Sequence, residues 1–293
     1  MTDILSDANQ ATPEDSVMGT RAREEQQAHA PEFNRKNQTR LVHVTILVTS
    51  LLSSDLLADD WPAFDRPGIL FAPEVLPVGV WSIELGSPDA SLTRSGGDRL
   101  EETALQGMFR YGLTTDWELQ FEFAPYVRER VKTVAGTDTQ TGHSDARVGV
   151  RSDASASMAD WFAADAVALQ AGVVLNTGHS NFKGSSNEVD LGIAASWQLP
   201  TDGHEVDAML QWIGTSGESI WFLATTYGFS INDSVSAFAE AGAWFGDENA
   251  SVAGAGVIWR SSGKFQVDGY LLKRLSGEIA DTQFGFGVSW MFF

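Results

Sequence analysis

Residues 284–293, FGFGVSWMFF, alternate between large apolar side chains and smaller or more flexible ones. One face carries Phe284, Phe286, Val288, Trp290 and Phe292, and the other carries Gly285, Gly287, Ser289 and Met291. This period of two predicts a β-strand with one face in an apolar environment. Because an unpaired apolar edge strand would aggregate, the strand must pair with another, and closure of the whole sheet removes the edge.

The same alternation recurs along the chain from about residue 80. Clear examples are WSIELG (81–86), WELQFEF (117–123) and EVDLGIAASWQL (188–199). About twelve such strands are present, most of about 8–11 residues, which is the length of a tilted strand that crosses the hydrocarbon layer. We therefore predict an all-β fold over residues 80–293, a closed antiparallel transmembrane β-barrel of about 12 strands of outer-membrane type.

A soluble β-sandwich would show similar alternation, because one face of each strand would point into a core. Two features favour the membrane. Trp81, Trp117 and Trp197 lie near strand ends, where membrane interfaces favour aromatic residues. The opposite faces mix charged residues with small ones such as Gly192 and Gly254, which suits the concave interior of a small barrel.

The connections between the expected strands alternate in length. Short turns rich in Gly, Asn, Asp and Pro are expected at 112–116, 200–204, 230–234 and 261–264. Longer polar loops are expected at 87–100, 128–144, 176–187 and 275–281. Short periplasmic turns that alternate with longer external loops are typical of outer-membrane barrels.

The first part of the chain resembles a targeting region. A basic start is followed by an apolar run at 41–52 and by Ala58, which is the order found in a secretory signal peptide. We predict a disordered extension or mis-assigned start at 1–35, a signal peptide at 36–58, and a periplasmic lead-in segment or plug at 59–79. The alternative for the apolar run is a short buried helix in a cytosolic protein.

Several short motifs together resemble the outer-membrane channel family named for the meta-pathway of phenol degradation, over about residues 64–293. They are RPG (66–68) leading to a first strand with an inward Glu84, FRYGLTTDWE (109–118), SDARVGVR (144–151), VVLNTG (173–178) and FQVDGYLLKRLS (265–276). The sequence departs from the family pattern at Asn176, which stands in place of a proline. The resemblance implies transport across the outer membrane and names no substrate.

Other functions have weaker support in the sequence. The net charge of −20 argues against a nucleic-acid partner, and the absence of cysteine excludes thiolate-bound metals and disulfides. The tetrapeptide Thr-Gly-His-Ser occurs at 141–144 and 177–180, but adjacent residues of a strand point to opposite faces, which is poor geometry for a hydrolase. We predict no catalytic residues, no metal site and no cofactor.

Charged side chains on the inward faces are the candidate functional residues, because a basic residue facing lipid at the midplane would cost about 2–4 kcal/mol. They either brace the wall or set the preference of a pore for ions and solutes. The predicted lumen-lining residues are Glu84, Glu102, Arg110, Glu118, Glu122, Arg147, Arg151, Glu188, Asp190, Glu205, Asp207, Glu240, Asp268 and Arg274.

The sequence thus predicts a bacterial outer-membrane channel that passes small solutes passively, with hydrophobic or aromatic compounds as the candidate class. The alternatives are a structural barrel with a sealed lumen and an outer-membrane lipid hydrolase. Expected partners are outer-membrane lipid, lipopolysaccharide and the barrel assembly machinery. The machinery's recognition signal would be Phe284, Phe286, Val288, Trp290, Phe292 and Phe293, although Phe293 is out of phase with the others.

Overall fold

The structure, a computed structural model, describes residues 62–293. The predicted extension, the predicted signal peptide and residues 59–61 of the predicted lead-in segment lie outside the described residues. The elements are β1 (Trp81–Ser95), β2 (Asp98–Gly112), β3 (Trp117–Thr133), β4 (Gly136–Gly142), β5 (Ala146–Asp153), α3 (Ser155–Phe162), β6 (Ala166–Leu175), β7 (Glu188–Gln198), β8 (His204–Gly214), β9 (Ser219–Asn232), β10 (Val235–Gly246), β11 (Ala250–Ser262), β12 (Phe265–Ser276) and β13 (Thr282–Phe292).

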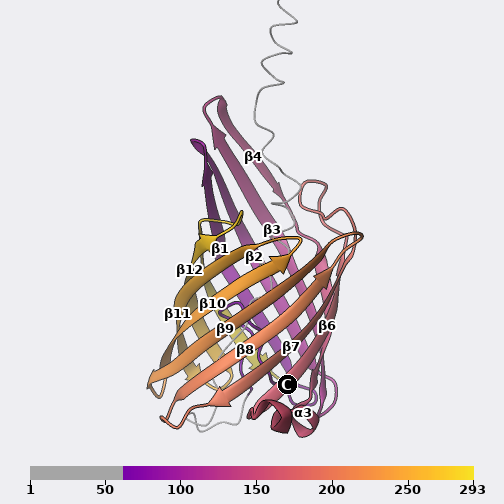
Figure 1. The fold of residues 1–293 in the computed structure, drawn as a ribbon, viewed down its shortest axis with the longest axis vertical. Helices are drawn as coiled ribbons and strands as arrows, with labels where there is room; N and C mark the ends of the chain where they lie inside the picture. Colours follow the sequence, from indigo (N-terminus) through magenta and orange to yellow (C-terminus); the bar gives the residue numbers. More distant parts are fainter. Residues whose placement is uncertain (1–61) are drawn as a thin grey trace, which may run out of the picture. The chain divides into compact units, whose positions relative to one another are not determined.

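The strands form one closed antiparallel barrel (Figure 1). The barrel closes where β1 pairs with β13, with Trp81 opposite Phe292 and Leu85 opposite Val288. β4 pairs with residues 127–133 of β3, and β5 pairs with residues 117–122 of the same strand. β4 and β5 together therefore occupy one position in the wall. The predicted closed antiparallel barrel of twelve strands is therefore confirmed. Within residues 62–293, the structure contains no helix of the length and apolar character needed to cross a bilayer.

The alternation in the sequence determines which side chains face outward. In β9, Trp221 and Leu223 are 39% and 50% exposed, whereas Phe222 between them is 2% exposed. In β13, Phe286 and Trp290 face outward, and Met291 is fully buried inside the barrel. Phe293 follows the end of β13 and is exposed, with the Lys264 ammonium 5.6 Å from the centre of its ring.

Two of the predicted long loops are wrong. Residues 87–100 belong mainly to β1 and β2, which are joined by a turn at 96–97, and residues 128–144 belong mainly to β3 and β4. These segments carry mostly polar residues on both faces, so the hydropathy contrast that marks the other strands fades although the strands continue. The two hairpins extend beyond the other strands (Figure 1). The expected loop at 176–187 does connect strands. Of the expected loop at 275–281, residues 277–281 connect strands and residues 275–276 still belong to β12.

The connection after β5 contains the short helix α3. It follows directly from the strand, and Ala163 ends it in the left-handed conformation, with φ of 48°. The Trp197 indole N–H donates a hydrogen bond to the Phe162 carbonyl at 3.1 Å, which ties the helix to the end of β7. This explains why the link is longer than the other turns at the same end of the barrel.

Candidate functional site

All fourteen predicted lumen-lining residues lie on strand positions that face the interior. Twelve of them are buried. The other two, Glu102 and Arg274, are half-buried and lie toward the ends of their strands that extend furthest from the turns at 112–116 and 261–264. Arg274 pairs there with Asp281. The interior therefore contains many charges, and their partners decide whether they line an aqueous path or hold the structure together.

Residues 62–80 precede β1 and form no strand, but many of them are buried inside the barrel. Phe64, Asp65, Leu70 and Phe71 are each no more than 2% exposed. We call residues 62–80 the inner segment. Its bonding partners come from β1, β2, β3, β5, β10 and β12, so it crosses the interior and does not follow one wall.

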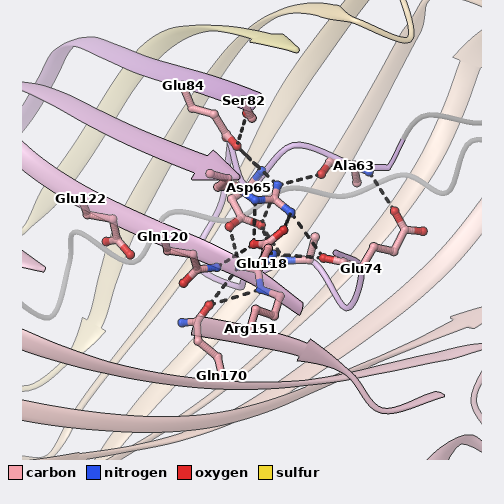
Figure 2. Close-up of polar contacts among 12 residues, drawn as sticks. Ala63, Asp65, Glu74, Ser82, Glu84, Glu118, Gln120, Glu122, Arg151 and Gln170 are labelled. Carbon is pink, nitrogen blue, oxygen red and sulfur yellow. Dashed lines mark hydrogen bonds and ion pairs between the residues drawn. The ribbon is translucent and has the colours of Figure 1, made fainter. Parts of the chain in front are cut away.

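Asp65 is the centre of the largest charged group of the interior (Figure 2). Arg151 of β5 donates to both of its carboxylate oxygens, at 2.9 and 2.5 Å. Arg110 of β2 lies 3.5 Å from Asp65 and donates two bonds of 2.9 Å to Glu118 of β3. Two-point guanidinium–carboxylate pairs of this kind have the strongest geometry among side-chain hydrogen bonds.

Glu84 of β1 completes this group by binding the backbone of the inner segment. Its two carboxylate oxygens accept bonds from the Asp65 and Arg66 amides at 3.1 and 2.8 Å. Arg110 also donates to the Ala63 carbonyl at 3.0 Å. Both the side chains and the backbone of the inner segment are therefore held by charged residues of the wall.

Arg66 makes a second attachment, to β1 and β12, on both sides of β13. Its guanidinium lies 3.4 Å from Asp268 of β12 and 3.6 Å from Asp89 of β1. The wall leaves space for it at Gly287, where an added Cβ would lie 2.3 Å from Arg66 Nε. A glycine on the inward face of β13 is therefore required by the position of this side chain.

The middle of the inner segment makes a third set of contacts. The Ile69 amide donates to Glu240 of β10 at 2.9 Å, and the Phe71 ring lies against Gly192 of β7, where a Cβ would be 2.7 Å away. The Arg151 guanidinium carbon stands 5.0 Å from the centre of the Phe71 ring, within cation–π range. The three attachments together fix the inner segment across the interior.

Arg147 of β5 forms a second ion-pair group with residues of the wall. Gln120 joins it to the Asp65 group, because it accepts a bond from Arg147 at 3.2 Å and donates one to Glu118 at 2.9 Å. Arg147 lies 2.6 Å from Glu122 of β3 and donates two bonds to Asp190 of β7 at 2.8 and 2.7 Å. This group braces β3, β5 and β7 without binding the inner segment. A substitution in this group therefore disturbs a buried ion pair of the wall without removing a direct contact to the inner segment.

The interior of β8 to β12 differs from the prediction. We expected charged and small residues on the inward faces, but large apolar side chains also point inward there. Phe222 and Trp244 stack with ring centres 4.4 Å apart, and they belong to one buried cluster with Ile69 and Phe71. Nearly continuous apolar runs such as SIWFLA (219–224) were the signal for this, because both faces of that strand are apolar.

Some buried polar atoms near this cluster have no protein partner. Within the described residues, the Trp244 indole nitrogen and the Gln211 side-chain oxygen make no hydrogen bond. Unpaired buried polar groups of this kind are uncommon and call for a physical cause such as an ordered water or an ion. The interior thus offers an apolar and aromatic wall with a free donor and a free acceptor.

The two Thr-Gly-His-Ser copies, which are distant in sequence, lie side by side. The His179 amide donates to the His143 carbonyl at 3.0 Å, and the two imidazole rings are 6.3 Å apart. The Ser144 hydroxyl is buried and bonds to backbone atoms of Asp145 and Ala124. No group of three or more metal-ligating side chains is placed to hold a metal ion between residues 62 and 293.

Comparison with known proteins gives a family match and several structural matches. The model of the family described as "Putative MetA-pathway of phenol degradation" matches residues 64–292. An outer membrane channel from Pseudomonas putida F1 is 17% identical, with a TM-score of 0.56 over 78% of this chain and 99% of that one.

Two further structures match with lower scores. The translocator domain of the autotransporter NalP from Neisseria meningitidis is 12% identical, with a TM-score of 0.49 over 74% of this chain and 89% of that one. The KdgM porin is 10% identical, with a TM-score of 0.48 over 72% and 99%. The comparison with curated proteins gives no match.

Proposed function

We propose, from the premise that this chain belongs to the family of the MetA-pathway of phenol degradation, that it is an outer-membrane channel for passive passage of small solutes. The family match covers most of the described residues, as the resemblance at the level of motifs predicted. The closed barrel with an apolar outer surface supports placement in the bacterial outer membrane, because closure leaves no backbone group unpaired in lipid.

The observation that carries the proposal is the attachment of the inner segment across the interior. A barrel of twelve strands lies between small barrels filled by side chains and large open channels. Here, Asp65 and Arg66 fix a chain segment across that interior through ion pairs, and between its ends the segment has no covalent link to the strands that it crosses. We infer that the inner segment is a plug, and that solutes pass when it shifts.

The lining of the interior suggests the class of solute. Phe222, Trp244 and their neighbours provide apolar and aromatic surface, while Gln211 and the Trp244 indole nitrogen provide polar contacts. Ligand sites commonly combine such surfaces with a few placed polar groups. We propose small hydrophobic or aromatic compounds that carry a polar group. The outer-membrane channel from Pseudomonas putida supports only the fold at its level of identity.

Conductance in planar bilayers tests the proposal. The wild-type barrel should give rare, small openings, and a variant lacking residues 64–74 should give larger and more frequent ones. Folding of the deletion variant is checked by heat-modifiable migration, and the double variant Asp65→Ala/Arg66→Ala provides a milder change. If neither the wild type nor any variant conducts ions or swells solute-loaded liposomes, the sealed structural barrel is the correct interpretation.

The hydrolase alternative has less support. The Ser144 hydroxyl is engaged by backbone atoms, and the exposed Ser180 belongs to the loop between β6 and β7. A phospholipase assay that compares the wild type with Ser144→Ala and Ser180→Ala decides the question. Activity that is lost in either variant would contradict the channel proposal as stated.

Recognition of the last strand by the barrel assembly machinery is also part of the proposal. Its outward side chains Phe284, Phe286, Val288 and Trp290 are all substantially exposed. Fractionation with outer membranes after expression in a Gram-negative host tests the proposed localisation independently of conductance.

A further inference from the structure

The outer faces of the two extended hairpins carry a concentration of basic side chains. Cross-strand pairs place Arg99 opposite Lys132 and Glu101 opposite Arg130, in the same outward alternation as Leu105 and Tyr126 nearer the membrane. Arg94 of β1 is paired with Arg99 and continues this face. We call Arg94, Arg99, Arg128, Arg130 and Lys132 the basic strip.

Charge is separated between the two faces of these hairpins. On the outward face of β1–β4, Glu101 is the acidic residue among the basic strip, and the residues of β4 that alternate outward are threonines. On the inward face, Glu102 lies opposite Glu129, and Asp138 follows on β4. A hairpin that needed only solubility would not require this separation, least of all in a chain of net charge −20.

The basic strip is only partly neutralised within the protein. Glu101 lies 2.7 Å from Arg99, 3.0 Å from Lys132 and 3.9 Å from Arg130, so three cations share one carboxylate. Their side chains remain 34–43% exposed. Arg94 and Arg128 are exposed and form no ion pair with any other residue between 62 and 293. The strip therefore presents several cations to a ligand outside the barrel.

The position of the basic strip, just beyond the aromatic outward face of the barrel, points to the ligand. Tyr126 is 47% exposed and marks the upper end of the aromatic outward face of β3. Arg128, Arg130 and Lys132 follow at steps of about 7 Å along the strand, since alternate residues share a face. We propose that this strip binds the phosphate groups of lipopolysaccharide in the outer leaflet, an inference that rests on the proposed outer-membrane placement.

Binding to purified lipopolysaccharide in detergent, with EDTA present, tests the inference. Native mass spectrometry should show retention of lipopolysaccharide by the wild-type barrel. Arg130→Gln/Lys132→Gln should bind about 30-fold more weakly, because each basic residue near an anionic surface contributes roughly fivefold in affinity. The matched control Lys183→Gln/Lys264→Gln removes the same charge from a different loop and from the opposite end, and should bind as the wild type does.

Two further ligands separate recognition of the phosphorylated lipid from attraction of any lipid or any anion. Dephosphorylated lipopolysaccharide should bind as weakly as the double variant does, and millimolar inorganic phosphate should not displace the intact lipid. Equal binding by Arg130→Gln/Lys132→Gln and the wild type would overturn the inference. Loss of wild-type binding in EDTA would do so as well, since divalent cations bridging to carboxylates would then account for the contact. Because the assay needs no conductance, a sealed barrel that binds lipopolysaccharide would overturn only the channel proposal.

Discussion

Replacing Asp65 with asparagine should release the inner segment from the wall while leaving the barrel closed. The change removes the charge that Arg151 binds through two oxygens and that Arg110 approaches at 3.5 Å. Both guanidinium groups are fully buried, so neither can recover its hydration while the segment stays in place. Breaking a buried pair in this way costs about 3–5 kcal/mol. The fraction of molecules with a released inner segment should therefore rise by about 150- to 5,000-fold.

Thiol labelling measures this release directly because the chain contains no cysteine. Ala72→Cys places a single thiol at a residue that is 1% exposed and lies in the inner segment. In detergent-solubilised barrel, a water-soluble maleimide should modify this thiol slowly in the Asp65 background. The labelling rate should increase in proportion to the released population when Asp65→Asn is added.

Glu122→Gln is the matched control, since Glu122 is also a buried carboxylate in an ion pair with arginine. Its partner Arg147 bonds to wall residues and not to the inner segment. Equal labelling in Asp65→Asn and Glu122→Gln would refute the reasoning, because it would show general loosening of the barrel. If labelling rises but planar-bilayer recordings show no added current, the inner segment moves without opening a path.

Three further predictions concern the wall itself. Gly287→Ala should displace Arg66, at a cost of about 1–3 kcal/mol typical of overpacking, and should raise thiol labelling without Asp65→Asn; unchanged labelling would contradict the contact. Leu223→Arg on the lipid face should lower the free energy of unfolding from vesicles by about 2–4 kcal/mol in urea titrations, whereas the same substitution on the surface of a soluble sandwich would change its stability little. Deletion of Phe293 alone should leave assembly into outer membranes intact, but deletion of Phe292 and Phe293 together should block it; equal yields would remove the assumed signal.

The strands were predictable because the membrane imposes a strict contrast between faces. Residues 117–123 of β3 and the whole of β13 alternate between apolar and polar or small side chains, and each alternation agrees with burial in the structure. Above the membrane this contrast disappears, which is why the outer halves of β1 to β4 were predicted to be loops. The interruption between β4 and β5 at 143–145 also has no local signal, since it depends on pairing with β3.

The contacts of the inner segment were beyond prediction for a different reason. The inward position of Arg110, Arg151 and Glu84 follows from alternation, but their partner Asp65 lies in a segment with no periodicity. Two signals were present without being decisive. Inward glycines such as Gly192 and Gly287 mark places where another chain segment approaches closely, and a charged interior needs counter-charges that the wall alone does not supply.

The use of ion pairs to hold the inner segment favours a reversible closure over a permanent one. Buried charges lose hydration that their attraction only partly offsets, and apolar residues of similar size often hold a structure equally well or better. A barrel that served only as a scaffold would gain stability from apolar residues at this position. The double variant Asp65→Leu/Arg151→Met, which leaves the Arg110–Glu118 pair in place, should therefore lock the inner segment. Labelling at Ala72→Cys should fall below the wild-type rate and channel openings should disappear, whereas faster labelling would show that the ion pair is needed for attachment.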